Sequence, residues 1–494
     1  MVSQRRHSFQ IERSRVFLGT LSALALFFPF IVIIANNLSF RIPLTSEVGW
    51  VISVTALQAA LSAIFSIAFG LIGAFGLLAL DGRLSRFAEG VALLPNAGPV
   101  ILLLLSVMKL FPWARGLTGI IFVHVLLNAG LLSVVFAEVI RTKLCGYAEL
   151  AWVEGATARQ FFRRVALPLL KPDLLLAFLF VFVLCFASFS VPLALGGSRA
   201  STIEVLIYQK IRVSGEWTAA IGLALLQTLT LIAFSFVLGR MRNETAAPTF
   251  RRIPFLIWKP GLIVPLFASL ILVIGLLEGV IAGARRAFAL PPLMAQLPSL
   301  LAGSVLVGFL AGLFTVVFLL LIAYVRPQGL FRKIVTAYAA PSSVLVGFSL
   351  LIVWRDLGFA SYVKIALAMT LVTVPSFLRF RWTALLDSLE GQVTIARTFG
   401  AGPGLVFRKI VLPQVIRPAF FLGGLCGLWA WGDFSLSGVV AERTMTVAMA
   451  VNGLMESYRL DIATFLVWFV ILGGFVTLGL FVGVGNVLGQ KPQA

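Results

Sequence analysis

The sequence contains one polar segment twice. Residues 149–168 read ELAWVEGATARQFFRRVALP, and residues 394–413 read TIARTFGAGPGLVFRKIVLP. In each segment a glycine precedes a Leu-Pro pair by the same spacing, and these anchors repeat 245 residues apart. The anchors are Gly155, Leu167 and Pro168 in the first segment and Gly400, Leu412 and Pro413 in the second. Both segments also contain a phenylalanine followed by two basic residues and a β-branched residue. Two copies of one element, half a chain apart, predict a protein built from two homologous halves.

The rest of the chain is too apolar for a water-soluble fold. Of its 494 residues, 60% are hydrophobic and 12% are charged, so most of the surface must face lipid. A net charge of +20 would suggest nucleic acid in a soluble chain, but these cations lie in short segments between apolar runs. That arrangement is typical of membrane topology. We therefore expect an all-α polytopic membrane protein, surrounded by membrane lipid, with no nucleic-acid partner.

Apolar runs of membrane-spanning length predict about twelve transmembrane helices, six in each half. In the first half the runs cover roughly residues 16–35, 49–80, 91–111, 118–140, 173–196 and 218–239. In the second half they cover roughly residues 260–283, 298–325, 334–354, 361–380, 419–440 and 462–484. The predicted domains are a first unit at 1–240, a cytoplasmic linker at 241–259 and a second unit at 260–494. Because Lys and Arg concentrate in the segments on one side, the positive-inside rule predicts that both termini and both polar segments are cytoplasmic.

Each polar segment is expected to form short helices interrupted at its glycine, because glycine adopts backbone conformations that other residues avoid. The Leu-Pro pair is expected to end this element before the next span, since proline cannot continue an interior helix ladder. Gly400, Gly402 and Gly404 do not form a phosphate-binding loop, because the sequence contains no Gly-Lys-Ser/Thr. The chain is therefore not expected to hydrolyse ATP, and no catalytic residue or cofactor is predicted.

The three cysteines, Cys145, Cys185 and Cys426, do not follow a metal-ligand spacing, and the chain has only two histidines. No metal site is therefore predicted.

The two polar segments resemble the EAA loops in permease subunits of bacterial binding-protein-dependent ABC importers. That family's pattern is Glu-Ala-Ala, three residues, glycine, and later a hydrophobic residue before Leu-Pro. In the first EAA loop, residues 141–171, the motif positions hold Glu149, Ala151, Gly155, Val165, Leu167 and Pro168. In the second EAA loop, residues 381–418, they hold Ala396, Gly400, Ile410, Leu412 and Pro413. Thr394 stands where the family has its glutamate, so the contact of that glutamate is in doubt in the second loop.

The resemblance covers the whole chain as two fused permease units. Such fusions are found in permeases similar to those for thiamine and for ferric iron. The first half is most similar to the fused thiamine permeases, in the patterns at residues 185–189, 195–197, 202–204 and 208–209. Gly432-Asp433-Phe434 agrees in the second half. Ferric-iron permeases share the Gly-Gly and Thr-Ile-Glu patterns, so the two substrates remain alternatives.

The resemblance implies a type I importer permease in the bacterial inner membrane. It implies that each EAA loop is a coupling helix seated on one subunit of an ATPase homodimer, and that a periplasmic binding protein delivers the substrate. The residues expected to couple to the ATPase are Glu149, Ala151, Gly155, Leu167, Pro168, Ala396, Gly400, Leu412 and Pro413. No chemistry on the substrate is implied. The alternative class is an ion-coupled secondary transporter, whose hallmark loop is only loosely matched at residues 81–86.

Several polar residues stand out from the apolar runs. Asp433 is predicted to lie within a span, where a carboxylate is costly enough that a functional or paired role is expected. Its counterpart in the first half is Ser188, and both are candidates for the substrate pathway. His124 and Asn128, one turn apart, predict an interhelical polar contact or, less favoured, a substrate site. In the outer loop, Glu204 and Tyr208 are expected to face solvent, the binding protein or the mouth of the pathway.

Overall fold

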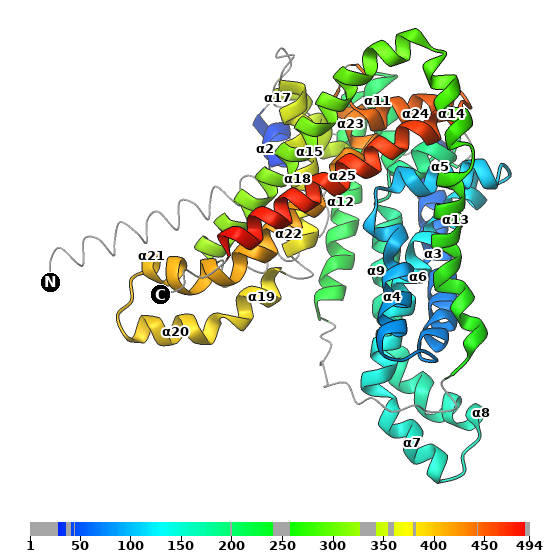
Figure 1. Ribbon diagram of the computed structural model, residues 1–494, viewed down its shortest axis with the longest axis vertical. Coiled ribbons are helices and arrows are strands. Elements are labelled where there is room, and N and C mark those ends of the chain that lie inside the picture. The colour runs from blue at the N-terminus through cyan, green and yellow to red at the C-terminus, as the bar shows by residue number, and fades with distance from the viewer. Residues whose placement is uncertain are drawn as a thin grey trace.

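The computed structural model describes residues 28–35, 41–43, 45–197, 200–240, 257–326, 342–353, 360–378, 382–441 and 443–489. Within these ranges all regular secondary structure is helical (Figure 1). The predicted linker at 241–259 lies almost entirely outside them.

Eight helices in the described ranges are long and apolar enough to cross a membrane, at 46–77, 116–143, 158–186, 217–234, 259–288, 291–325, 403–431 and 460–488. A ninth is present if α4 (Gly82–Ala97) and α5 (Val100–Leu110), which meet at 91°, form one broken span. Two other expected spans appear as shorter apolar helices, α17 (Ser343–Val353) and α18 (Ala360–Phe377). The expected span at 16–35 lies mostly outside the described residues, which include only α2 (Phe28–Ala35). The chain is a multi-pass, all-helical membrane protein.

Equivalent helices follow one another in the same order in both halves. The first half contains α3 (Ser46–Leu77), α6 (Gly116–Lys143), α7 (Cys145–Val153), α8 (Ala158–Phe161), α9 (Leu167–Phe186), α10 (Ser190–Leu195), α11 (Ile203–Arg212) and α12 (Trp217–Arg240). The second contains α15 (Pro291–Val325), α18, α20 (Glu390–Thr398), α21 (Pro403–Val406), α22 (Leu412–Trp431), α23 (Ser435–Val440), α24 (Val447–Glu456) and α25 (Leu460–Leu488).

Individual hydrogen bonds repeat between the halves as well. The amide of Ile203, at the start of α11, donates to Thr55 Oγ1 at 3.0 Å, and the amide of Val447, at the start of α24, donates to Ser304 Oγ at 2.9 Å. The repetition therefore extends from the order of helices to single contacts.

The Leu-Pro pairs do not end a helix, so that expectation is wrong. A π-helical turn, Phe162–Ala166, joins α8 to α9, and a second one, Phe407–Val411, joins α21 to α22. The amide of the leucine before each proline bonds to a carbonyl five residues back, Phe162 O or Phe407 O. Such a wide turn accommodates the proline ring, and the missing N–H then falls in the first turn of the following α-helix. Continuous helices therefore run from each EAA loop into the membrane.

The fifth predicted span of each half was placed too late in the chain. The helix at 158–186 ends at Phe186 and is followed, after a three-residue break, by α10. In the second half α22 ends at Trp431, and α23 begins at Ser435. Asp433 therefore lies in a break between two helices and not within a span.

The two halves exchange helices with each other. Helix α13 (Ile263–Leu277), from the second half, packs against α4, α5 and α6 of the first. Reciprocally, α2 from the first half packs against α17 of the second.

Glu204 joins the halves and is not solvent-exposed, contrary to one of the expectations for the outer loop. It is fully buried on α11. Its Oε2 accepts hydrogen bonds from Ser342 Oγ at 3.1 Å and from the amide of Val344 at 3.4 Å, at the start of α17. Its Oε1 accepts from Gln227 Nε2 at 3.1 Å. A carboxylate at a helix N-terminus complements the helix dipole.

The other end of α11 carries a matching cation. The guanidinium of Arg212 donates to the carbonyls of Val439 at 2.6 Å and Ala441 at 3.0 Å, at the end of α23. A cation is favoured at a helix C-terminus for the same electrostatic reason. Helix α11 of the first half thus caps two helices of the second.

We predict that Glu204 makes stability depend on pH. Burial raises the pKa of Glu204 from 4.5 to about 7. Between these values the folded chain keeps a proton that the unfolded chain releases, so stability falls as the pH rises through this window. The E204Q variant should lose this dependence, which amounts to a free energy on the order of 3 kcal/mol. Thermal unfolding of the purified protein between pH 5 and 8 measures it. The exposed Glu216 provides the control, because E216Q should retain the wild-type slope.

Candidate functional site

The first EAA loop turns at Gly155. Helix α7 ends two residues earlier, at Val153, and Gly155 has a φ of +71°, in the left-handed region. Its amide donates to Trp152 O at 3.1 Å, and the next amide, of Ala156, donates to Ala151 O at 2.9 Å. These two bonds form a Schellman cap, in which the residue at Gly155 must adopt a positive φ. In the motif the alanine precedes the glycine by four residues. The cap needs this spacing, because the carbonyl of Ala151 accepts one of its two bonds and Gly155 forms the turn.

The second EAA loop forms the same cap with different neighbours. Gly400 has a φ of +80°. Its amide donates to Arg397 O at 2.9 Å, and that of Ala401 donates to Ala396 O at 3.0 Å. Neither Gly155 nor Gly400 has any atom within 4 Å of where a Cβ would stand. Glycine is therefore required in both loops for its backbone conformation and not for lack of space.

The two loops expose apolar side chains away from the end of the molecule that contains α11 and α24. In Figure 1, α7 and α8 lie at the lower end, α20 and α21 lie at the left, and α11, α14 (Val280–Phe288) and α24 lie at the upper end. Val153 in the first loop is 79% exposed, and Phe399 in the second is 86% exposed. Leu150 and Ile395, at equivalent positions, are also exposed. Clustered apolar side chains in an exposed loop mark a surface for binding another protein.

The other predicted coupling residues divide into two groups. Glu149 is half-buried on α7. The pKa of the nearby Cys145 thiol is raised, mainly by burial and to a lesser extent by the Glu149 carboxylate. Ala151 and Ala396 are half-buried within their caps. The Leu-Pro pairs lie apart from the caps, beyond the π-helical turns. Leu167, Pro168 and Pro413 are exposed there, and Leu412 is half-buried.

A cavity of about 440 Å³ lies between the halves, and we call it the central cavity. It brings together both candidate pathway residues, Ser188 and Asp433. Its other polar side chains come from both halves and are Asn96, His124, Asn128, Ser190, Ser343 and Ser435. Its volume is in the range of small-molecule sites.

Asp433 holds the start of α23. Its Oδ2 accepts from the amide of Ser437 at 2.7 Å and from Ser437 Oγ at 2.9 Å. Its Oδ1 accepts from the amide of Leu436 and from Ser435 Oγ, each at 3.2 Å. The preceding residue, Gly432, packs so closely that a Cβ would stand 2.0 Å from Pro99 Cβ of the first half. Asp433 therefore has both a structural role, as the cap of α23, and a place on the cavity wall.

In the first half the equivalent residue makes a different contact. Ser188 Oγ lies 3.0 Å from His124 Nε2, and His124 Nδ1 lies 3.1 Å from Gln58 Oε1. The expected interhelical role of His124 and Asn128 agrees with these contacts, but both residues also line the central cavity. Gln58 was not selected from the sequence, although a single amide within an apolar span was a usable signal.

The halves meet directly at residues 190 and 435. Ser190 Oγ and Ser435 Oγ are 2.7 Å apart, and their sequence separation of 245 equals the repeat distance. Equivalent residues that touch each other must lie on the axis relating the halves. This contact therefore marks the pseudo-two-fold axis at the wall of the central cavity.

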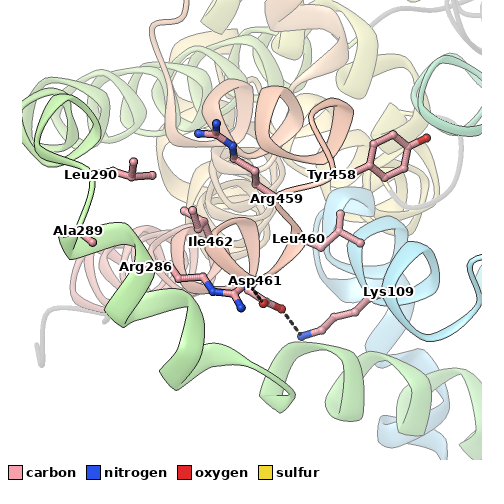
Figure 2. A pocket seen from close by; sticks show the side chains of 9 residues that line it. All are labelled: Lys109, Arg286, Ala289, Leu290, Tyr458, Arg459, Leu460, Asp461 and Ile462. Carbon is pink, nitrogen blue, oxygen red and sulfur yellow. Dashed lines mark hydrogen bonds and ion pairs between the residues drawn. The ribbon is translucent and has the colours of Figure 1, made fainter.

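A second cavity, of about 620 Å³, lies among α5, α14 and the start of α25, near the end opposite the EAA loops (Figures 1 and 2). Asp461 accepts a hydrogen bond from Arg286 at 2.7 Å and lies 3.8 Å from Lys109 Nζ. The side chain of Arg459 points away from Asp461 (Figure 2). Three cations against one carboxylate make this cavity basic, and we call it the outer cavity.

Comparison with known proteins agrees with this architecture. The family model of the binding-protein-dependent transport system inner membrane component matches residues 66–243 and 326–489, which include both EAA glycines. No solved structure matches the chain significantly.

Among individual proteins, the chain is similar to the thiamine transport system permease protein ThiP of several bacteria. It is 29% identical to that of Escherichia coli (strain K12) over 36% of this chain and 31% of the relative. It is 34% identical to that of Haemophilus influenzae over 24% and 23%, and 31% identical to that of Brucella suis over 28% and 27%. Each of these matches spans less than a third of the relative's length. Because the family model matches more than half of the sequence, in two copies, the chain belongs to the binding-protein-dependent transport system inner membrane components, the permease subunits of ABC importers.

Proposed function

We propose that this chain forms the membrane pathway of a thiamine importer, with two fused permease units at 1–240 and 260–494 joined by the linker at 241–259. Permeases of this family work in general with an ATPase and a substrate-binding protein. The observation that carries the proposal is the pair of EAA loops, which repeat one Schellman cap and both expose apolar side chains. The similarity to thiamine permeases supports the choice of substrate.

Each EAA loop is the docking site for one subunit of an ATPase homodimer. An exposed apolar side chain gains free energy when a partner covers it, at about 25 cal/mol per Å². Phe399 and Val153 have the highest fractional exposure among the large apolar side chains of the two loops. Because the Schellman cap fixes how α7 and α20 end, it also fixes how these side chains are presented. ATP hydrolysis then takes place in the partner chain, and the permease performs no chemistry.

In this arrangement the EAA loops and both termini are cytoplasmic, and the membrane is the bacterial inner membrane. The positive-inside rule supports this orientation. The outer cavity then faces the periplasm. Its basic residues Lys109, Arg286 and Arg459 complement an acidic surface on the periplasmic binding protein.

The substrate path runs through the central cavity past Asp433 and Ser188. A carboxylate in a low-dielectric site attracts a cation much more strongly than one in water. Thiamine and ferric iron are both cationic, and ferric iron is the second candidate because its permeases share sequence patterns with this chain. Aromatic side chains beside Asp433, among them Trp429 and Phe434, favour an organic cation.

We predict that the turn at Gly155 is required for transport. A tryptophan there must adopt a positive φ and adds bulk to the docking surface, so G155W should abolish uptake and co-purification of the ATPase. G155N should retain most of both, because asparagine tolerates the left-handed region. T394A should be nearly silent, since Thr394 is exposed and replaces the motif glutamate. Full ATPase recovery and uptake in G155W would contradict the coupling role.

We further predict that removing the charge of Asp433 impairs uptake. Asparagine keeps much of the cap on α23, so D433N should fold and bind the ATPase while its uptake falls at least tenfold. Uptake of labelled thiamine and of labelled Fe(III), in cells containing the whole transporter, measures the effect and separates the substrates. Wild-type uptake by D433N would exclude the pathway role, and Fe(III) uptake without thiamine uptake would replace the proposed substrate.

A further inference from the structure

We propose that the central cavity is selective for an organic cation that donates hydrogen bonds, because Gln58 and His124 orient the hydroxyl of Ser188 as an acceptor. This inference rests on the proposed function and specifies the substrate chemistry of the same pathway. Gln58 and His124 act here as positioning residues, since they set the hydrogen position on Ser188.

The chain of contacts begins at a backbone carbonyl. Gln58 is fully buried, and its Nε2 donates to Cys185 O at 2.8 Å. A carbonyl oxygen can only accept, so the amide of Gln58 cannot be flipped. Its Oε1 is therefore the atom that lies 3.1 Å from His124 Nδ1.

This orientation determines the tautomer of His124. An amide oxygen accepts a hydrogen bond, so Nδ1 must carry the hydrogen. The ring is buried, and the side chains that contact it, Gln58, Ser62 and Ser188, are neutral. The neutral ring has its lone pair on Nε2, which then accepts from Ser188 Oγ at 3.0 Å. The only hydroxyl hydrogen of Ser188 is thus directed at His124, and the oxygen presents lone pairs to the cavity.

The opposite wall of the central cavity, around Ser190 and Ser435, also uses its hydroxyl hydrogens within the protein. Ser435 Oγ donates to Asp433 Oδ1, so in the short contact between the two serines Ser190 must be the donor. The hydroxyl hydrogens of both serines are therefore used within the protein. Asp433 adds negative charge to this wall, while its two oxygens already accept four hydrogen bonds from residues 435–437. Asn128 also directs its amide nitrogen at the protein, toward His124 O at 2.8 Å and Cys185 Sγ at 3.9 Å.

Three side chains on the wall can still donate, and one of them is Trp429, through its indole N–H. Asn96 uses one amide hydrogen on Leu127 O and keeps the second. The buried hydroxyl of Ser343 has no hydrogen-bond partner among the described residues. These donors stand beside Ser188 and Ser190, whose hydroxyl hydrogens are used within the protein, and beside the negative charge of Asp433. This part of the wall therefore favours a ligand that supplies hydrogens and positive charge.

An aromatic surface completes the site. Trp429 lines the cavity and stacks on Phe377, with ring centroids 5.7 Å apart. A tryptophan face held in place by a neighbour attracts a cation. Thiamine combines a thiazolium cation with an amino group that donates hydrogen bonds. In oxythiamine an oxygen replaces that amino group, so the two compounds test the polarity of the wall.

The experiment measures direct binding to the permease–ATPase complex in lipid nanodiscs, without the binding protein, so that the selectivity of that protein does not enter. Labelled thiamine is competed with unlabelled thiamine or oxythiamine. We expect the wild type to prefer thiamine. S188A removes one acceptor and should lower the preference about 5- to 10-fold. Q58M removes the group that fixes the His124 tautomer, so Ser188 can turn its hydrogen to the cavity, and oxythiamine should bind more tightly than to the wild type.

S62A is the matched control, because Ser62 Oγ also lies near His124 Nδ1, at 3.5 Å, but does not line the cavity. It should keep the wild-type preference. If S188A keeps that preference while thiamine uptake is normal, this inference is wrong and the proposed function stands. If the complex neither binds nor transports thiamine, the proposed substrate fails and this inference fails with it. Should Q58M not fold, the S188A result decides alone.

Discussion

The hydrogen bond between Ser190 and Ser435 is the contact on which the arrangement of the two halves depends. These equivalent residues touch each other, so they lie on the pseudo-two-fold axis. The central cavity lies against this contact, and helix α11 fixes the halves around it through Glu204 and Arg212. Any substrate that moves along the axis must separate the two serines. In the described structure the two serines are in contact, so the path between them is closed.

The continuous helices explain how an event at the EAA loops reaches this contact. The helix at 158–186 runs without a break from the first loop to the residues before Ser188, and the helix at 403–431 does the same toward Asp433. At 1.5 Å per residue each is about 43 Å long. If an ATPase subunit moves each EAA loop, as proposed, a rigid element carries that displacement to the cavity wall. Rigid-body movement of this kind is an established route for switching between two states.

The sequence allowed the repeat, the membrane class and the loop glycines to be predicted, because each depends on local chemistry. The turn at each loop glycine was expected from the sequence, but the Schellman caps themselves, such as the one at Gly155, are seen only in the structure. The breaks before Ser190 and Ser435 were missed, since apolar residues continue through them and hydropathy does not register a turn. The burial of Glu204 could not be predicted from the sequence either, because its partners at the start of α17 are about 140 residues away in the chain.

Cross-linking the axis tests the central claim most directly. The double variant S190C/S435C places two thiols where the hydroxyls are 2.7 Å apart, and the three native cysteines are buried. After oxidation, we predict that the ATPase remains bound and that uptake of labelled thiamine stops. Reduction should restore the uptake of the unoxidised double variant, whereas oxidation should not change the uptake of either single variant. Undiminished uptake by the fully cross-linked protein would show that the substrate does not pass between these residues.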